Sequence, residues 1–559
     1  MIKIEEYNTQ KFFNLAEIIK DLAEEGNLLD QNPSSRDIKR IINTKVKDIP
    51  SEHVLHDMIA NHKELGIYKS DTGNFCAFSE PMSRAAPFTK NNIDSCFGKE
   101  EDQLIHQCLD AYKNYIKDKE NIISLDCIVG DKDNDATVRL TIPERFIQVA
   151  YGAERLFSPA GRNLKKPTYE IIMFDDLEFD KNRSRKLPDK DITIRLAHSP
   201  EGRMIKIIRN SNYFGEYKKG VFAGEDFNAK LKDKGIFLHA GCRTDLLKNF
   251  EGDYKSKSGL FVALSANGKT STVCLTLARK GYEKSWLIQD DGGTLTKDGS
   301  FKGFEGEGIF AKTDLVNPAE QLQTYYGILK PDTFCENVYV MKDGSLNFYD
   351  RSITKNGRAV IRRKDFMHAH QEINSEKIDY ITLITRHPLI PAISKLTREQ
   401  AAAWMVLGQA MESSAGDPTQ EGKIKNLFFY DPFMAGDKAE HANLFYDITE
   451  NLPDMQFYLL NTGGIGERDE YKDITLNSTM GILDSLLREG LRKWEKSPIM
   501  DLEVPKAIRD VDTILVHPEK IYSDKSLFEQ KLDKLYRHNA EVIEKIGERL
   551  YKPIRDVFR

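Results

Sequence analysis

Apolar positions near the start of the chain recur at the spacing of an amphipathic helix. Five of them predict one buried face: Phe13, Leu15, Ile18, Ile19 and Leu22. A further helix is expected near residues 101–115. From residue 122 the pattern changes to short strands separated by turns, over 122–130 and 136–142, and then to a helix over 143–156. Nothing in the first 65 residues is typical of a chemical site.

The most informative pattern lies near the middle of the chain. Residues 259–264 are mostly apolar and predict a short buried strand, which leads into a tight turn over 265–271. Residues 270–279 are then predicted to form a helix, and the apolar run 286–288 predicts a second strand that ends in a pair of aspartates.

This order of elements is typical of a site for a nucleoside triphosphate. A strand that enters a helix through Gly268-Lys269-Thr270 directs backbone N–H groups at phosphate oxygens. Lys269 would hold a positive charge over the outer phosphates, and the Thr270 hydroxyl would bind a divalent cation. Asp290 and Asp291 would bind the metal or its waters. A lone Gly-Lys-Thr is common, and Val262 stands at the position of the usual first glycine, so the prediction depends on the surrounding elements.

Other elements frame this stretch. Further strands are expected at residues 192–195, 204–208, 378–385 and 457–460, and a strand–turn–strand pair at 336–349. Thr397 and Gln400 form a capping box, which predicts a helix from there to about residue 411. Residues 527–559 are predicted to be a charged helical tail.

Three further places allow two interpretations each. Residues 212–220 are predicted to form an aromatic, glycine-containing turn with two adjacent lysines, which is either a surface hairpin or a cationic pocket for an anionic substrate. The apolar strand 235–238 ends on His239, which is either a satisfied core histidine or a metal ligand. Arg84 lies in a polar loop over 79–89, where a lone arginine is usually solvated.

Composition narrows the class of protein. A chain of 559 residues is too long for one core, so two or three domains are expected. The net charge of −6 argues against nucleic-acid binding, and no run of 18 apolar residues predicts a membrane span. No secretory signal is visible, and the seven scattered cysteines lack CxxC spacing, so reduced thiols in a cytoplasmic protein are expected and a structural zinc site is not.

Eight segments resemble ATP-dependent phosphoenolpyruvate carboxykinases, in the same order, over most of residues 122–500. They are VRLTIPERFIQVAYGAERLF, NYFGEYKKGVF, LFVALSANGKTS, LIQDDGG, FEGEGIFAKT, ENVYVMKDGSLNF, LIPAISKLTREQAAAWMVLG and NTGG. The resemblance implies an α/β (mixed α+β) fold of two domains. It places an N-terminal, substrate-side domain at residues 1–235 and a C-terminal, P-loop-containing domain that binds nucleotide and metal at 236–559.

The resemblance also implies roles for particular residues. Four would hold metal: Lys219, His239, Thr270 and Asp291. Four would be catalytic: Lys219, Lys269, Asp290 and Arg358. Oxaloacetate would contact Arg84, Tyr213, Lys219 and Arg358. The nucleotide would contact Leu264, Ser265, Ala266, Asn267, Gly268, Lys269, Thr270, Ser271, Glu320 and Thr479.

The implied reaction converts oxaloacetate and ATP to phosphoenolpyruvate, CO₂ and ADP with Mn²⁺ and Mg²⁺, as in gluconeogenesis. GTP is not excluded, and the enzyme would be a monomer or a small homo-oligomer acting on small molecules. The sequence departs from the family at three places. It lacks the Gly-Arg-Ser-Pro-Lys-Asp motif of the substrate arginine, for which Arg84 is the nearest candidate. Ala266-Asn267 stands where the family's P-loop has Gly-Thr, and Asp-Asp-Gly-Gly-Thr stands where the family has Asp-Asp-Glu-His-Gly. Two alternatives therefore stay open, a diverged ATP-dependent kinase with another acceptor and a non-catalytic nucleotide-binding protein.

Overall fold

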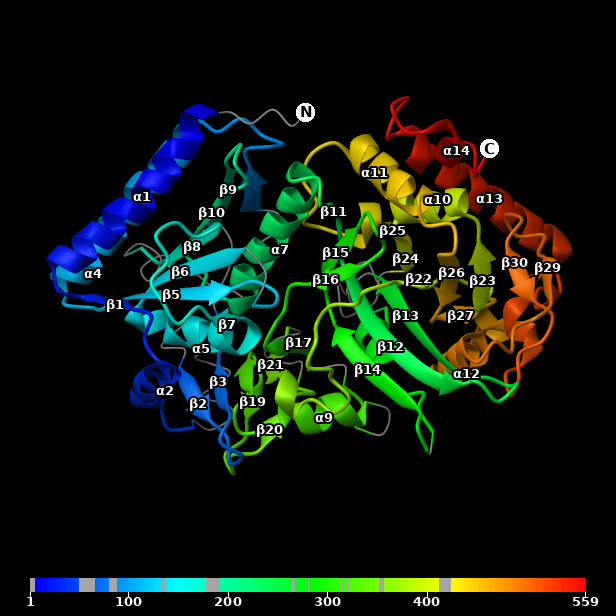
Figure 1. The fold of residues 1–559 in the computed structure, drawn as a ribbon, viewed down its shortest axis with the longest axis horizontal. Helices are drawn as coiled ribbons and strands as arrows, with labels where there is room; N and C mark the ends of the chain where they lie inside the picture. Colours follow the sequence, from blue (N-terminus) through cyan, green and yellow to red (C-terminus); the bar gives the residue numbers. More distant parts are fainter. Residues whose placement is uncertain are drawn as a thin grey trace.

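The protein is a mixed α/β molecule built around several sheets (Figure 1). The computed structural model describes residues 6–49, 66–79, 88–132, 136–176, 192–263, 267–279, 281–313, 316–318, 321–350, 356–411 and 424–559. The expected fold class is confirmed. None of the helices in these ranges combines the length and the apolarity needed to span a membrane.

The N-terminal half forms an eight-stranded sheet. Its order is β1 (Leu29–Gln31), β5 (Ile122–Ile128), β6 (Thr137–Pro143), β8 (Tyr169–Phe174), β10 (Met204–Arg209), β9 (Thr193–His198) and β4 (Thr89–Asn91), with β7 (Ser158–Pro159) paired to β5. Alternate residues of its strands face opposite sides. Ile172 packs against α1 (Glu6–Glu25) and α4 (Lys99–Lys117), whereas Ile171 packs in the core that contains α5 (Ile147–Leu156) and α7 (Phe214–Leu231).

A second eight-stranded sheet forms the C-terminal half. Its order is β14 (Lys284–Gln289), β12 (Ala240–Lys248), β13 (Tyr254–Val262), β22 (Tyr380–Thr385), β26 (Gln456–Asn461), β23 (Ile393–Leu396), β30 (Glu503–Pro505) and β29 (Trp494–Lys496). Strands β13, β22 and β26 are parallel, and β12 is antiparallel to both β13 and β14. The carboxyl ends of β14, β13, β22 and β26 therefore meet at one edge, where α/β proteins place their ligands.

Two smaller sheets complete this part of the fold. One has the order β17 (Gly308–Lys312), β21 (Arg358–Arg362), β18 (Phe334–Glu336), β3 (Phe75–Ala77) and β2 (Ile67–Lys69). The other contains β11 (Gly235–Leu238), β15 (Gly293–Thr296) and β16 (Phe301–Gly303). Because the first sheet combines strands from both sides of residue 235, the division into domains at that residue stays a prediction.

Local predictions are confirmed at several elements. The capping box holds the start of α10 (Arg398–Leu407), where the Thr397 side chain accepts from the Gln400 N–H. The predicted end near residue 411 is wrong, because the helix ends at Gly408 and β24 (Gln409–Met411) follows it. Gly408 has a φ of 50°, in the left-handed region that glycine adopts most easily. The tail contains α13 (Lys525–Glu544) and α14 (Lys552–Arg555). On α1 the predicted apolar face is wrong at one position, since Ile18 is 43% exposed. All seven cysteines are free.

Candidate active site

The prediction of a turn over residues 212–220 is wrong, because α7 begins at Phe214. Phe214, Tyr217, Val221 and Phe222 recur every three or four residues and are all buried, so the helix anchors an apolar face in the N-terminal core. The two lysines lie within its first two turns, and they point to different partners because adjacent helical residues are about 100° apart.

Lys218 is the lysine that pairs with Asp291. Its Nζ lies 2.5 Å from Asp291 Oδ2 and 2.8 Å from Glu305 Oε1, and its side chain is 5% exposed. Lys219 Nζ lies 2.6 Å from Glu216 Oε1, and Glu216 also pairs with the buried Lys206 at 2.9 Å. Burial opposes ionisation of Glu216, but these two lysines outweigh it and lower its pKa to about 2. The metal role of Lys219 stays a prediction.

The phosphate turn, which is the turn over residues 265–271 that is predicted to bind phosphate, follows β13 and enters α8 (Lys269–Cys274), and the structure describes it from residue 267. Gly268 has a φ of 90°, which glycine adopts without strain. Lys269 Nζ lies 2.5 Å from Asp291 Oδ1. The helix predicted to reach residue 279 ends at Cys274 because nearby groups bind the chain there. Arg243 Nη1 donates to the Thr272 carbonyl at 2.6 Å, and the Leu277 N–H donates to Ser285 Oγ at 3.0 Å.

The two aspartates follow β14 at the sheet edge. Burial raises the pKa of Asp291, but Lys218 and then Lys269 outweigh it, so the pKa lies well below its usual range. Burial and then the neighbouring Asp291 raise the pKa of Asp290 to about 6, and the Thr270 hydroxyl hydrogen-bonds to Asp290. Asp291 is thus ionised and Asp290 is close to titration at neutral pH.

His239 presents a nitrogen lone pair to Asp291. Its Nδ1 lies 2.8 Å from the Tyr430 carbonyl, which can only accept, so Nδ1 carries the proton. Burial and then Lys269 lower the pKa of His239, which keeps the ring neutral. Its Nε2 lies 3.0 Å from Asp291 Oδ1, so the imidazole nitrogen and the carboxylate oxygen present two lone pairs side by side. Two such donors fit a divalent cation.

His239 and Asp291 alone are too few ligands for a metal centre. Within the described ranges, no three His, Cys, Asp or Glu side chains are grouped so that they could hold a metal ion. His239 and Asp291 supply two donors, and the Thr270 hydroxyl is linked to them only through Asp290. A complete set would need a lysine amine or solvent.

Arg358 and Tyr213 lie beside the two lysines. The Phe310 ring centre is 5.0 Å from Lys218 Nζ and 5.7 Å from the Arg358 guanidinium, so both cations lie close to this ring. Lys219 Nζ lies 5.3 Å from the ring centre of Tyr213, which is buried. Glu336 is the strand partner of Arg358, and its Oε1 accepts from the Phe214 N–H at 2.8 Å, at the start of α7.

Some of the remaining predicted nucleotide contacts lie in or near the phosphate turn, and others do not. The Asn267 carbonyl accepts from Thr462 Oγ1 at 2.8 Å, and Gln321 Nε2 donates to Ser271 Oγ at 2.7 Å. Thr479 is buried on α12 (Leu476–Leu487), and no contact is seen between it and the predicted site residues that the structure describes. Five predicted contacts lie outside the described residues: Arg84, Leu264, Ser265, Ala266 and Glu320.

Sequence reasoning missed three residues of the site. The sequence analysis gave roles to Lys219 and none to Lys218, although only one of two adjacent helical lysines can face a given partner. Glu305 is fully buried against Lys218, and burial raises its pKa to about 7. The signal for Glu305 was weak, since an acid in a glycine-rich loop is usually exposed. The carbonyl of Tyr430 leaves no sequence signal.

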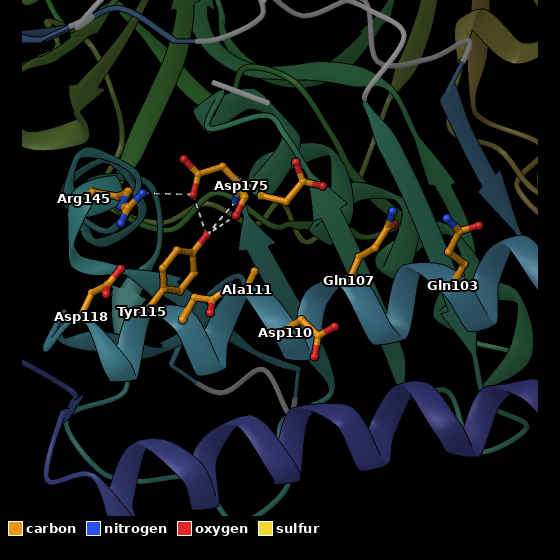
Figure 2. Close-up of a pocket in the computed structure, with 10 residues that line it drawn as sticks. Gln103, Gln107, Asp110, Ala111, Tyr115, Asp118, Arg145 and Asp175 are labelled. Carbon is orange, nitrogen blue, oxygen red and sulfur yellow. Dashed lines mark hydrogen bonds and ion pairs between the residues drawn. The ribbon is translucent and has the colours of Figure 1, made fainter. Parts of the chain in front are cut away.

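Two cavities lie near α4 and α7. One of about 380 Å³ is lined by α4 together with Arg145 and Asp175, and Figure 2 shows Tyr115 donating to Asp175 there. It contains none of the predicted site residues. The other, of about 190 Å³, is lined in part by Lys206, Glu216 and Lys219, so it adjoins the site on the side of the N-terminal sheet.

The comparisons with known proteins point to one family. The family model described as phosphoenolpyruvate carboxykinase matches residues 91–514. A phosphoenolpyruvate carboxykinase (ATP) of Aeropyrum pernix is 27% identical over 343 residues, which is 61% of this chain and 67% of the relative. One of Campylobacter jejuni subsp. doylei is 28% identical over 343 residues, 59% of this chain and 61% of the relative. One of Staphylococcus aureus is 25% identical over 513 residues, 87% and 90% of the two chains.

Proposed function

The chain belongs to the phosphoenolpyruvate carboxykinase family, and we propose that it converts oxaloacetate and ATP to phosphoenolpyruvate, CO₂ and ADP. In this direction the reaction is a step of gluconeogenesis. One observation carries the proposal: Lys269 of the phosphate turn, Lys218 of α7 and His239 all converge on the carboxylate of Asp291. Phosphate-binding and substrate-side elements therefore meet at one group.

The side chains of the site are suited to neutralise charge. Decarboxylation of oxaloacetate leaves an enolate, whose oxygen then attacks the γ-phosphoryl group of ATP. Lys269 and Arg358 would spread the negative charge of the transferring group, in a half-buried site where such contacts are stronger than in water. Asp291 pairs with Lys218 and Lys269 and holds both side chains in place before the substrates bind. No side-chain base is required by this reaction.

His239 and Asp291 would hold a divalent cation, with the lysine amine that the sequence predicts. A bound Mn²⁺ or Mg²⁺ supplies a positive charge next to the developing enolate oxygen. The protein's part is to fix the donors. The Tyr430 carbonyl sets the tautomer of His239, and burial holds the ring neutral, so that its Nε2 is available.

The test is formation of phosphoenolpyruvate by the purified protein with oxaloacetate, Mn²⁺ and Mg²⁺, and either ATP or GTP. We expect phosphoenolpyruvate and nucleoside diphosphate in equal amounts. Lys269→Ala should reduce the rate by several orders of magnitude, because a cation is lost from a charge-dominated transition state. Lys302→Ala, at an exposed position of β16, is the matched control and should leave the rate unchanged.

Two results would point to other functions. Release of ADP without phosphoenolpyruvate would favour a diverged kinase with another acceptor, which the missing Gly-Arg-Ser-Pro-Lys-Asp motif allows. ATP binding without any turnover would favour a non-catalytic nucleotide-binding protein.

A further inference from the structure

Arg386 lies at the same sheet edge as the phosphate turn. It directly follows β22, which is parallel to β13 on one side and to β26 on the other. In the register Val262 pairs with Leu383 and Thr385 pairs with Asn461, so the chain leaves all three strands at neighbouring points (Figure 1). The phosphate turn follows β13, Arg386 follows β22, and Thr462 follows β26.

One threonine connects Arg386 to the phosphate turn. Arg386 Nε donates to Thr462 Oγ1 at 3.4 Å, and this hydroxyl donates to the Asn267 carbonyl at 2.8 Å. A Cβ built on Gly268 would lie 3.8 Å from Thr462 Oγ1, so the threonine packs against the glycine of the turn. A Cβ on Gly463 would lie 3.2 Å from Arg386 Cβ, which shows how closely the strand end fits the arginine.

Among the described residues, negative charge acts on the Arg386 guanidinium only from beyond ion-pair distance. In the part of the chain that the structure describes, no carboxylate lies within ion-pair distance of Arg386. The acid that acts on it electrostatically is the exposed Asp473, together with the Tyr471 hydroxyl. By contrast, the buried Arg243 is held by both oxygens of Asp245 at 2.7 Å.

Partial burial without a carboxylate is unfavourable for a cation. Arg386 is half-buried, and burial lowers its pKa. An anion that arrives at this edge would supply the missing charge. Because the arginine is already held at Nε, its two terminal nitrogens remain for the planar, two-point contact that a guanidinium makes with phosphate.

We propose that Arg386 is a nucleotide-binding residue that contacts the phosphate chain of ATP. This inference rests on the proposed nucleotide site and adds to it a cation that the sequence did not predict. Arg386 acts in binding, so its loss raises the KM for ATP with little change in kcat. Thr462 is its positioning residue, because it joins the guanidinium to the carbonyl of Asn267.

The test is calorimetric titration of the full-length protein with MgATP, MgADP and adenosine. Arg386→Ala should weaken the binding of MgATP and of MgADP about 10- to 100-fold, because a charge-assisted contact is lost. The affinity for adenosine should stay unchanged. Arg386→Lys should recover part of the loss, and Thr462→Val should give a smaller loss of the same kind. Arg537→Ala, whose side chain is 78% exposed on α13, is the matched control.

Several outcomes would overturn the proposal. Wild-type affinity for MgATP in Arg386→Ala would do so, and so would an equal loss for adenosine, which would place the arginine at the nucleoside. If Arg386→Ala fails to fold, Arg386→Gln preserves more of the packing and carries the same test. A wild-type protein that binds no MgATP would overturn both this inference and the proposed function. If the wild type makes phosphoenolpyruvate and Arg386→Ala binds MgATP as tightly as the wild type does, only the inference about Arg386 is overturned.

Discussion

Two neighbouring lysines of α7 differ in what their loss would leave behind. Lys218 is the ion-pair partner of both Asp291 and Glu305, and all three side chains are largely buried. If Lys218 is removed, Asp291 keeps Lys269, whereas the fully buried Glu305 loses the lysine that holds it. Lys219 shares Glu216 with Lys206, so Glu216 keeps one ion pair if Lys219 is removed. A buried charge that loses its partner is strongly destabilising.

Lys218→Met should therefore lower the free energy of unfolding more than Lys219→Met does. We expect a loss of about 3–5 kcal/mol for Lys218→Met, as for other broken buried pairs. For Lys219→Met the loss should be about 1–2 kcal/mol, because a hydrogen bond to a charged group is removed while the ion pair of Glu216 with Lys206 remains. Denaturant unfolding of both variants measures the difference, and equal losses would contradict the pairing seen in the structure.

Glu336 makes the stability of the folded protein depend on pH. Burial raises its pKa from 4.5 to about 8, although the Phe214 N–H and Arg358 act in the opposite direction. The folded state thus holds a proton that the unfolded state releases. The stability from this proton is fully present below pH 4.5 and is lost as the pH rises through 8.

Glu336→Gln should remove this dependence, because an amide does not titrate. Between pH 6 and pH 8 the wild type should lose roughly 2–3 kcal/mol more stability than the variant, at about 1.4 kcal/mol for each pH unit. Unfolding curves of both proteins at the two pH values measure this. Parallel pH dependence of the two proteins would show that Glu336 does not carry the proton.

At the scale of elements, the short helix α8 depends on a buried arginine beneath it. Arg243 is 1% exposed, binds Asp245 through two contacts of 2.7 Å and donates to the carbonyl of Thr272. Six residues are too few for a helix to be stable by itself. The arginine thus holds the helix that carries Lys269 and Thr270.

Replacing Arg243 should weaken nucleotide binding separately from stability. Arg243→Met leaves Asp245 buried without its partner, and we expect a loss of about 3–5 kcal/mol. The double variant Arg243→Met, Asp245→Leu removes both charges and should recover most of this stability. The KM for ATP should stay raised in both variants, because the Thr272 carbonyl is released in each. A normal KM in the double variant would show that the arginine only stabilises the fold.

Elements whose signals are local could be predicted from the sequence. The capping box at Thr397 and Gln400, the strands around residues 260, 288, 382 and 458, and the paired aspartates after β14 all follow from short-range pattern. The convergence of Lys269 and Asp291 could be expected because both follow strands of one sheet.

Features set by distant contacts could not be predicted. The end of α8 depends on two residues of other strands: Arg243 binds the Thr272 carbonyl inside the helix, and Ser285 binds the Leu277 N–H just beyond its end. The choice of Lys218 over Lys219 as the partner of Asp291 depends on the rotation of α7 against the sheet. The start of α7 at Phe214 was hidden by glycines and aromatic residues that are more typical of a turn.

At the scale of the molecule, the two halves share a sheet. Strand β3 pairs with β18 in parallel, with Phe75 opposite Phe334 and Cys76 opposite Cys335, and all four side chains are fully buried. Removing residues 1–235 would expose this apolar surface and the edge of β18.

A fragment of residues 236–559 should therefore not fold by itself. We expect an insoluble product or one that unfolds without a cooperative transition, because its five-stranded sheet would lose β2 and β3. Scanning calorimetry of the fragment beside the full chain measures this. A cooperative transition, with MgATP bound at the affinity of the full chain, would show that the C-terminal half is an independent domain.

The most direct test of the central claim is carbon fixation in the reverse direction. Phosphoenolpyruvate, ADP, Mn²⁺ and ¹⁴C-bicarbonate are incubated with the protein, and oxaloacetate is trapped by reduction to malate. We predict acid-stable label and ATP in equal amounts, dependent on both phosphoenolpyruvate and ADP, and lost in Lys269→Ala. ATP formed without acid-stable label would contradict the account, because the phosphoryl transfer would then not be coupled to a carboxylation.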